Sequence, residues 1–183
     1  IAYTEETRFD FDGSATVTFP AGFPMLGGIS SGFDANFGIV WPRSLGVGIK
    51  HDLCACRRLG VDVIWYDWSH AFDQLELNLT DPSNAALGGA PVQDVMDLDW
   101  HDTVSFRFGY EWDAYEDLTW RLGYVYHDSP VENSTLTPYL DGVLEHAFSL
   151  GLSRKLEKAT INLAYQYSFG PTREIEDSAL AGD

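Results

Sequence analysis

The sequence has few basic side chains and no long apolar run, and each shortage excludes a class of protein. Eleven lysines and arginines stand against 28 aspartates and glutamates in 183 residues, a formal net charge of −17. Such an acidic chain gains nothing from the release of phosphate counterions, so nucleic acid is excluded as a partner. No stretch approaches 18 uninterrupted apolar residues, which excludes a transmembrane helix. The chain also begins without an initiator methionine or a signal peptide, so we expect a piece of a longer protein.

Cysteine is equally scarce. Cys54 and Cys56 form a lone Cys-Ala-Cys. A metal site built from cysteine needs about four ligands, usually in two separated pairs, and the second pair is missing. The sequence therefore predicts no metal site. Two interpretations of the cysteines stay open, namely two free thiols or one tight disulfide in a turn.

Three adjacent His-Asp pairs also fail to form a site. They are His51-Asp52, His101-Asp102 and His127-Asp128. Neighbouring residues on a strand point to opposite faces, so neither member of a pair can reach a centre that the other reaches. We therefore predict no catalytic residue, no metal ligand and no cofactor, and expect that the protein is not an enzyme.

The residues that are abundant alternate along the chain. Aromatic residues make up 14% of the sequence and apolar residues 45%, which argues against disorder. In residues 103–112 every second side chain is large and apolar, and residues 118–127 and 160–169 repeat the pattern. Since successive side chains of a strand point to opposite faces, each segment predicts a strand with one apolar and one polar face.

The whole chain predicts seven strands. Their expected ranges are 1–11, 37–51, 58–80, 99–113, 117–128, 145–155 and 159–170. The connections between them alternate in length: long segments at 12–36, 81–98 and 129–144 are separated by short turns near Cys54, Asp113–Glu116 and Glu157-Lys158. Short turns at one end and long loops at the other are typical of an antiparallel up-and-down meander.

The residue types on the two faces favour a membrane protein. Tryptophan and tyrosine lie toward the strand ends of the apolar face, where they suit the headgroup level of a bilayer. The opposite face carries Gly, Ser, Thr, Asn and Gln, as the lumen of an outer-membrane barrel does. We therefore predict an all-β fold, an antiparallel up-and-down transmembrane β-barrel. The alternative is a soluble β-sandwich, which predicts that Trp112, Trp120 and Tyr124 are buried between two sheets.

Several motifs occur together in a distinctive order. They are Tyr66-Asp67-Trp68-Ser69, Phe72-Asp73-Gln74-Leu75, Trp100-His101-Asp102-Thr103, Arg107-Phe108-Gly109-Tyr110, Leu118-Thr119-Trp120-Arg121-Leu122-Gly123-Tyr124, Asp128-Ser129-Pro130-Val131, Leu150-Gly151-Leu152 and Tyr165-Gln166-Tyr167-Ser168-Phe169-Gly170. In this order they resemble the FadL-like outer-membrane transporters of long-chain fatty acids and other hydrophobic compounds, over essentially the whole chain.

The resemblance implies more than the alternation does. Members of that family are 14-stranded barrels plugged by an N-terminal hatch, and this chain looks like strands seven to thirteen. It implies that residues 1–183 are a single partial β-barrel domain from which the hatch and the closing strand are absent. Because seven strands fall short of the roughly eight that a small closed barrel needs, we expect a curved, open sheet.

An apolar segment in the first long connection is the candidate substrate groove. Its residues are Phe19, Phe23, Met25, Leu26 and Phe33. Exposed apolar clusters often mark binding sites, and in the family the corresponding loop helps to form the first, low-affinity groove. The other interpretation is that these side chains cover the mouth of the barrel.

Basic side chains on the polar face are the candidate lumenal contacts. Arg107 and Arg121 lie on adjacent predicted strands and are able to attract a carboxylate, or they pair with lumenal acids such as Glu111 or Asp62. Family members that bind fatty acids use basic lumenal side chains near the strand that matches Trp100. Here that neighbourhood is acidic and only His101 can carry a positive charge, which keeps neutral hydrocarbons among the expected substrates.

Together these features predict a protein of the bacterial outer membrane, in contact with lipid and lipopolysaccharide. We expect it to take up hydrophobic small molecules, either long-chain fatty acids or aromatic and aliphatic hydrocarbons, by facilitated diffusion. The alternative is a surface-exposed structural or adhesive barrel, because the long loops are acidic and would bind cations weakly.

Overall fold

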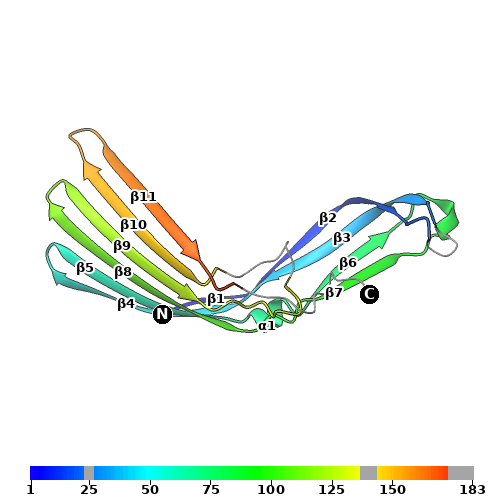
Figure 1. Ribbon diagram of the computed structural model, residues 1–183, viewed down its shortest axis with the longest axis horizontal. Helices are drawn as coiled ribbons and strands as arrows, with labels where there is room; N and C mark the ends of the chain where they lie inside the picture. The colour runs from blue at the N-terminus through cyan, green and yellow to red at the C-terminus, as the bar shows by residue number, and fades with distance from the viewer. Residues whose placement is uncertain (23–26, 137–143, 173–183) are drawn as a thin grey trace.

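The computed structural model describes residues 1–22, 27–136 and 144–172. The chain is almost entirely strand (Figure 1). The strands are β1 (Ala2–Thr4), β2 (Thr7–Thr18), β3 (Ser30–Trp41), β4 (Ser44–Cys54), β5 (Arg57–Tyr66), β6 (Gln74–Thr80), β7 (Val92–Asp97), β8 (Thr103–Tyr115), β9 (Leu118–His127), β10 (His146–Lys155) and β11 (Thr160–Phe169). Two short helical turns, α1 (Trp68–Ala71) and η1 (Ala85–Leu87), interrupt them. No helix in the described ranges is both long and apolar enough to cross a membrane.

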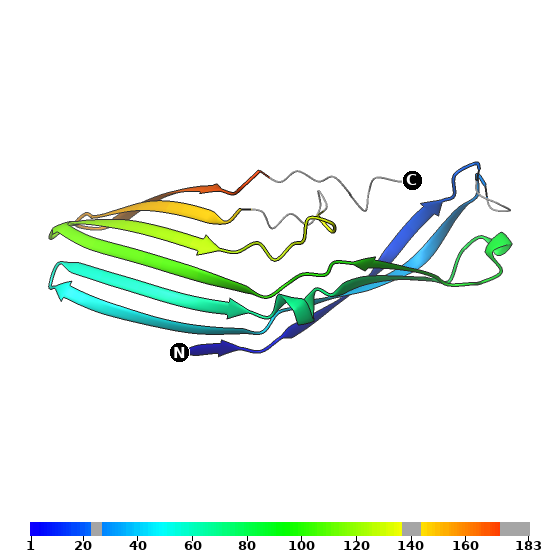
Figure 2. The same cartoon turned by 60° about the horizontal axis from the view of Figure 1, so that its bottom comes forward.

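The larger sheet has seven antiparallel strands in the order β1-β4-β5-β8-β9-β10-β11. Its hairpins close through short turns at one end, on the left in Figure 1. Strands β1 and β11 form its two edges, and within the described residues they do not pair with each other. The sheet is therefore open and curved (Figure 2), which confirms the predicted partial barrel.

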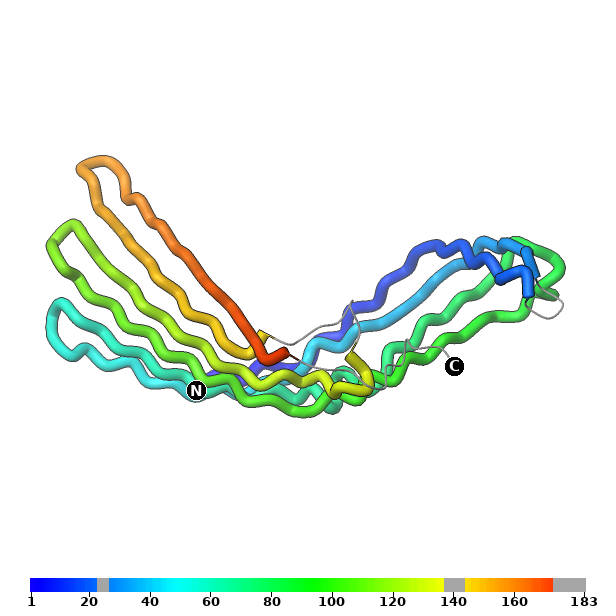
Figure 3. The backbone as a smooth tube through the Cα atoms, in the orientation of Figure 1, coloured from blue at the N-terminus to red at the C-terminus, as the bar shows by residue number. Residues whose placement is uncertain are grey.

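The smaller sheet, with the order β2-β3-β6-β7, corrects the prediction of long connections at one end of the strands. Residues 12–36 and 81–98 were expected to be long connections, but most of the first segment and part of the second are strands of this sheet. The alternation there was hidden because the hairpin of β2 and β3 carries many small residues between its aromatic ones. The first three predicted strands thus run through both sheets and bend between them, and the fourth, 99–113, corresponds to β8, which β7 precedes in the smaller sheet (Figure 3).

Three of the four bends have a local cause. Pro42 separates β3 from β4, since proline has no N–H for the ladder. The predicted strand 58–80 is broken by α1, and the Phe72 amide closes that turn on the Trp68 carbonyl at 2.8 Å. Before β8, Asp99 adopts a left-handed backbone with φ of 48°. The predicted strands 117–128, 145–155 and 159–170 have no such break and appear as β9, β10 and β11.

The apolar face of the seven-stranded sheet is bare. Leu122, Phe148 and Tyr165 expose 52%, 53% and 67% of their surface, although all three lie on interior or well-paired positions of the ladder. Trp112 and Trp120 expose 40% and 37%, so no second layer covers them, contrary to the soluble-sandwich alternative. A single-layer sheet with an exposed apolar face is the arrangement of a barrel wall in lipid.

The buried apolar residues are few: Phe33 and Leu79 lie within the smaller sheet, and the others lie where the two sheets join. Phe72, Leu98 and Val131 are buried there. The Trp100 ring stacks on Phe72 at 4.6 Å and meets the edge of Trp68 at 5.2 Å between centroids. This aromatic cluster fills the junction, so the bend between the sheets is a packed element of the structure.

Candidate functional site

Three glycines form a strip of bare backbone on the polar face of the seven-stranded sheet. Gly60 of β5 lies opposite Gly109 of β8, and Gly109 lies opposite Gly123 of β9. A Cβ atom added at Gly60 or Gly109 would meet nothing within 4 Å, whereas one at Gly123 would approach the Ser149 hydroxyl to 2.3 Å. The face is therefore open above the first two glycines.

A row of charges borders this glycine strip on the side of the short turns. Arg58 Nη2 lies 2.5 Å from Glu111 Oε1, and Arg121 Nε lies 2.5 Å from Glu111 Oε2. Arg58 also reaches Asp113 Oδ2 at 3.0 Å. Two arginines and two carboxylates thus neutralise each other across β5, β8 and β9.

Hydrogen bonds extend the row to the edge strand. Arg121 donates to the Ser153 hydroxyl, and that hydroxyl lies 2.6 Å from Asn162 Oδ1 on β11. Every partner side chain comes from the polar face of its strand: Ser153 pairs directly with Asn162, and Arg121, which pairs with Gly151, reaches Ser153 diagonally across the ladder. The structure places Arg121 in this network, so its guanidinium is already engaged by protein groups; attraction of a substrate carboxylate stays a prediction.

Arg107 lies on the other side of the glycine strip. It faces Asp62 across the ladder of β5 and β8. Its guanidinium donates to the Tyr66 hydroxyl at 3.1 Å, and no ion pair joins Arg107 to Asp62 within the described residues. A lumenal contact to substrate at Arg107 stays a prediction.

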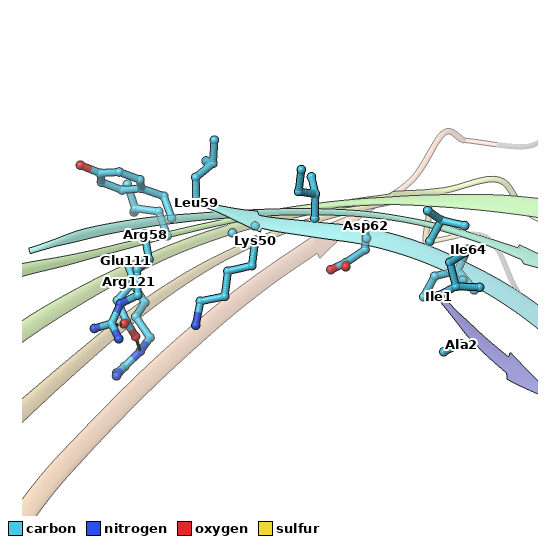
Figure 4. Close-up of a pocket in the computed structure, with 17 residues that line it drawn as sticks. Ile1, Ala2, Lys50, Arg58, Leu59, Asp62, Ile64, Glu111 and Arg121 are labelled. Atoms are coloured by element: carbon cyan, nitrogen blue, oxygen red, sulfur yellow. Dashed lines mark hydrogen bonds and ion pairs between the residues drawn. The ribbon is translucent and has the colours of Figure 1, made fainter. Parts of the chain in front are cut away.

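A cavity of about 640 Å³ follows this face. Figure 4 shows Lys50, Arg58, Asp62, Glu111 and Arg121 on one side of the sheet, with Leu59 on the other. Gly60 and Gly109 line the cavity between these polar groups. Its volume lies in the range of small-molecule sites.

His101 lies away from this face, in the connector at the sheet junction. Its Nδ1 atom is 3.3 Å from Glu132 Oε1, and its amide donates to the Pro130 carbonyl at 3.0 Å. The structure therefore does not bring His101 together with Arg107 and Arg121, which lie on strands of the seven-stranded sheet. A lumenal contact at His101 stays a prediction.

Two carboxylates fix α1 at the same junction. Asp67, only 5% exposed, accepts from Arg43, and Asp102 Oδ1 accepts from the Ser69 hydroxyl at 2.7 Å and the Ser69 amide at 3.2 Å. Burial by itself would raise the pKa of Asp102, but these hydrogen bonds outweigh it and hold the pKa below its ordinary value. The residues on both sides of Trp68, Asp67 and Ser69, are thus fixed by bonds to Arg43 and Asp102.

The structure describes only two of the five predicted groove residues, Phe19 and Phe33. Phe23, Met25 and Leu26 lie outside the described residues. Phe19 is half-buried and its amide donates to the Ile29 carbonyl at 2.9 Å. Phe33 is only 3% exposed and lies on β3 beside the turn at residues 81–84, where the Ser83 amide donates to the Gly32 carbonyl.

The smaller sheet carries an apolar surface where the alternation of residues predicted strand and loop but no site. Phe11 of β2 stacks on Phe37 of β3 at 4.9 Å between centroids. Phe9, Phe11 and Met96 expose 48%, 44% and 42% of their surface. The alternation of Phe9, Phe11 and, on β6, Leu75 and Leu77 is the signal from which this surface could have been found.

No three histidine, cysteine, aspartate or glutamate side chains converge as metal ligands in the part of the chain that the structure describes. Weak cation binding by the acidic loops stays a prediction.

Comparison with known proteins identifies the family. Residues 1–182 match the sequence profile of the outer membrane protein transport proteins (OMPP1/FadL/TodX). The chain belongs to this family. The protein is accordingly an outer-membrane β-barrel protein. The exposed apolar face of the curved sheet is consistent with a part of the barrel wall. No curated protein matches the sequence closely enough to count as a relative.

Solved structures share the fold at low sequence identity. The chain superposes with a TM-score of 0.70 and 18% identity on a FadL homologue of Pseudomonas aeruginosa, covering 92% of this chain and 40% of that one. The toluene transporter TodX of Pseudomonas putida superposes with a TM-score of 0.65 and 19% identity, covering 90% of this chain and 38% of that one. The toluene transporter TbuX of Ralstonia pickettii superposes with a TM-score of 0.59 and 16% identity, covering 91% of this chain and 37% of that one. The chain thus spans about two fifths of the length of these structures.

Proposed function

We propose that the full-length protein takes up hydrophobic small molecules across the bacterial outer membrane by facilitated diffusion, without covalent chemistry. The observation that carries this proposal is the cavity on the polar face, where the arginine and carboxylate charges neutralise each other beside bare glycine backbone. Such a surface offers a neutral molecule room to pass and no fixed charge strong enough to retain it.

The apolar surface of the smaller sheet supports the first step of uptake. It lies beyond the junction, at the end opposite the short turns (Figure 1). In bacterial barrels the short turns face the periplasm and the longer connections face outward. Phe9, Phe11 and Phe37 therefore belong to an outward-facing surface that collects apolar molecules, with Phe19 and Phe33 on the same hairpin.

Within the hydrophobic compounds, we favour neutral hydrocarbons over fatty acids. Arg58 and Arg121 are neutralised by Glu111, and the segment before β8 is acidic at Asp94, Asp97 and Asp99. At Arg58 or Arg121 a carboxylate would have to displace one of these pairs, and before β8 it would approach like charges. The names of two structural neighbours as toluene transporters agree with this preference.

An uptake assay tests the proposal. The full-length protein is expressed in cells that lack their own transporters of this family, and entry of radiolabelled toluene and oleate into the cells is timed. We expect toluene uptake to rise severalfold over vector-only cells and oleate uptake to rise less. A rise for oleate alone would overturn the substrate preference, and no rise for either would overturn the proposed function.

A matched pair of variants localises the collecting surface. Replacing both Phe11 and Phe37 by Ser removes the stacked pair and should lower uptake severalfold at low substrate concentration. The control is Glu76→Gln, on the exposed polar face of β6 in the same sheet, which should leave uptake unchanged. Equal uptake by both variants would remove the apolar surface from the route.

The polar face of the smaller sheet supports the alternative, an adhesive or structural barrel. That face carries Asp10, Asp12 and Asp34 on β2 and β3, where carboxylates are able to attract cations. A protein that binds calcium in isothermal titration and leaves toluene and oleate uptake at the vector level would favour this alternative.

A further inference from the structure

The only two cysteines of the chain lie in contact at a hairpin turn. Cys54 ends β4, Cys56 precedes β5, and their Sγ atoms are 2.9 Å apart. A single small residue, Ala55, separates them. Cys54 is exposed and Cys56 is half-buried, and both are free thiols in this structure.

Neighbouring strands fix the backbone that brings the sulfur atoms together. The Cys56 carbonyl accepts from the Asp113 amide of β8 at 2.8 Å. The next residue, Arg57, holds its guanidinium over the Trp112 ring at 5.9 Å, and Arg58 pairs with Glu111 and Asp113. The ladder is also irregular between Asp52 and Cys54, which lets this end of β4 turn toward Cys56. The approach of the two thiols is therefore built into the hairpin.

The position of the turn sets its chemical surroundings. It lies at the same end of the sheet as the β8–β9 and β10–β11 turns, opposite the smaller sheet (Figure 1). Short turns of bacterial outer-membrane barrels face the periplasm, which is kept oxidising toward cysteine pairs. An exposed dithiol at this place meets oxidised dithiol proteins.

We propose that Cys54 and Cys56 are a modification site, closed into a disulfide by thiol–disulfide exchange with an oxidised dithiol protein of the periplasm. The more exposed Cys54 attacks the disulfide of that protein as a thiolate, breaks its S–S bond and forms a mixed disulfide. Cys56, as a thiolate, then attacks the Cys54 sulfur and releases the other protein. Two electrons and the two thiol protons pass to the partner, which leaves as a dithiol.

The proposal is tested on the full-length protein in its own membrane. Cells are quenched with acid, and outer-membrane protein is denatured, treated with N-ethylmaleimide without reductant, digested and analysed by mass spectrometry. We expect the peptide that contains Cys54 and Cys56 to carry no adduct and to weigh two hydrogens less than the dithiol form. After reduction it should carry two adducts.

A Cys56→Ser variant supplies the matched control. It cannot close the ring, so its peptide should carry one adduct without reduction, which shows that the reagent reaches Cys54. Two adducts on the wild-type peptide without reduction would overturn the proposal. A wild-type peptide linked through its cysteines to another protein would overturn it as well, because the assigned bond is within the turn.

Discussion

Arg121 of β9 lies directly across the ladder from Glu111 of β8, and its Nε atom is 2.5 Å from Glu111 Oε2. The same carboxylate receives Arg58 from the strand on its other side. One acid therefore links three neighbouring strands on the face that borders the cavity.

Replacing Glu111 by Gln should destabilise the protein. The substitution leaves Arg58 and Arg121 close together without their shared countercharge, and Glu111 exposes only 23% of its side chain. Since both arginines are more exposed, we expect a loss of about 1–2 kcal/mol, measured as the urea midpoint of reversible folding into lipid vesicles. Glu157→Gln, in the exposed β10–β11 turn, is the control. Equal midpoints for both variants would show that the network adds nothing.

Arginine should be tolerated on one face of the sheet and rejected on the other. Leu150 of β10 lies on the bare apolar face with 45% exposure, and Gln166 of β11 lies on the polar face. Leu150→Arg should cost about 2–4 kcal/mol, as a charge facing lipid does near the bilayer midplane, and Gln166→Arg much less. The same folding titration measures both. A similar cost for the two variants would contradict the assignment of the faces.

A larger side chain in the glycine strip should slow uptake without unfolding the barrel. A Cβ at Gly109 meets open space, so Gly109→Leu fits the wall while its side chain occupies part of the cavity. We expect a severalfold fall in toluene uptake for Gly109→Leu and a smaller one for Gly109→Ala, with unchanged folding titrations. Uptake at the parent rate by a folded Gly109→Leu protein would place the route elsewhere.

Acid should loosen the junction through Asp102. Its pKa is held below the ordinary carboxyl value of about 3.9, so its contribution to stability is present above about pH 4 and is lost as the pH falls through the lowered pKa. Asp102→Asn should remove this part of the pH dependence, and so should Ser69→Ala, which deletes the donor. The urea midpoint is compared between about pH 6 and about pH 3. Parallel pH curves for parent and Asp102→Asn would contradict the role of the carboxylate.

The sequence was sufficient for the wall of the barrel. Strands β9, β10 and β11 were predicted in nearly their observed bounds, because Trp120, Leu122 and Tyr124 alternate strictly with polar residues and nothing interrupts them. The same alternation correctly predicted which face is apolar and exposed.

The smaller sheet and the bends were missed for physical reasons. In β2 the apolar positions after Phe11 are filled by Gly13 and Ala15, whose small side chains give little periodic signal. The helical turn at Trp68 follows Asp67, whose partner Arg43 is 24 residues away in the sequence. Such contacts depend on the folded arrangement of strands, and local alternation carries no information about them.

One part of the candidate site was predicted from the sequence and another part was not. Arg121 was expected on the polar face with Glu111 as a possible partner, and both appear there. The alignment of Gly60, Gly109 and Gly123 depends on the register of two hairpins, which the sequence alone did not fix.

The smaller sheet lies above only part of the seven-stranded wall. Its four strands are continuous in the chain with β1, β4, β5 and β8, and within the described residues β9, β10 and β11 have no counterpart in it. In the described part of the chain, paired strands therefore continue beyond the junction above β4, β5 and β8, and none continues above β9, β10 and β11 (Figure 3). In the uptake that we propose, a molecule that approaches the wall above β4, β5 and β8 would therefore contact a paired strand surface before it reaches the level of the lumenal cavity.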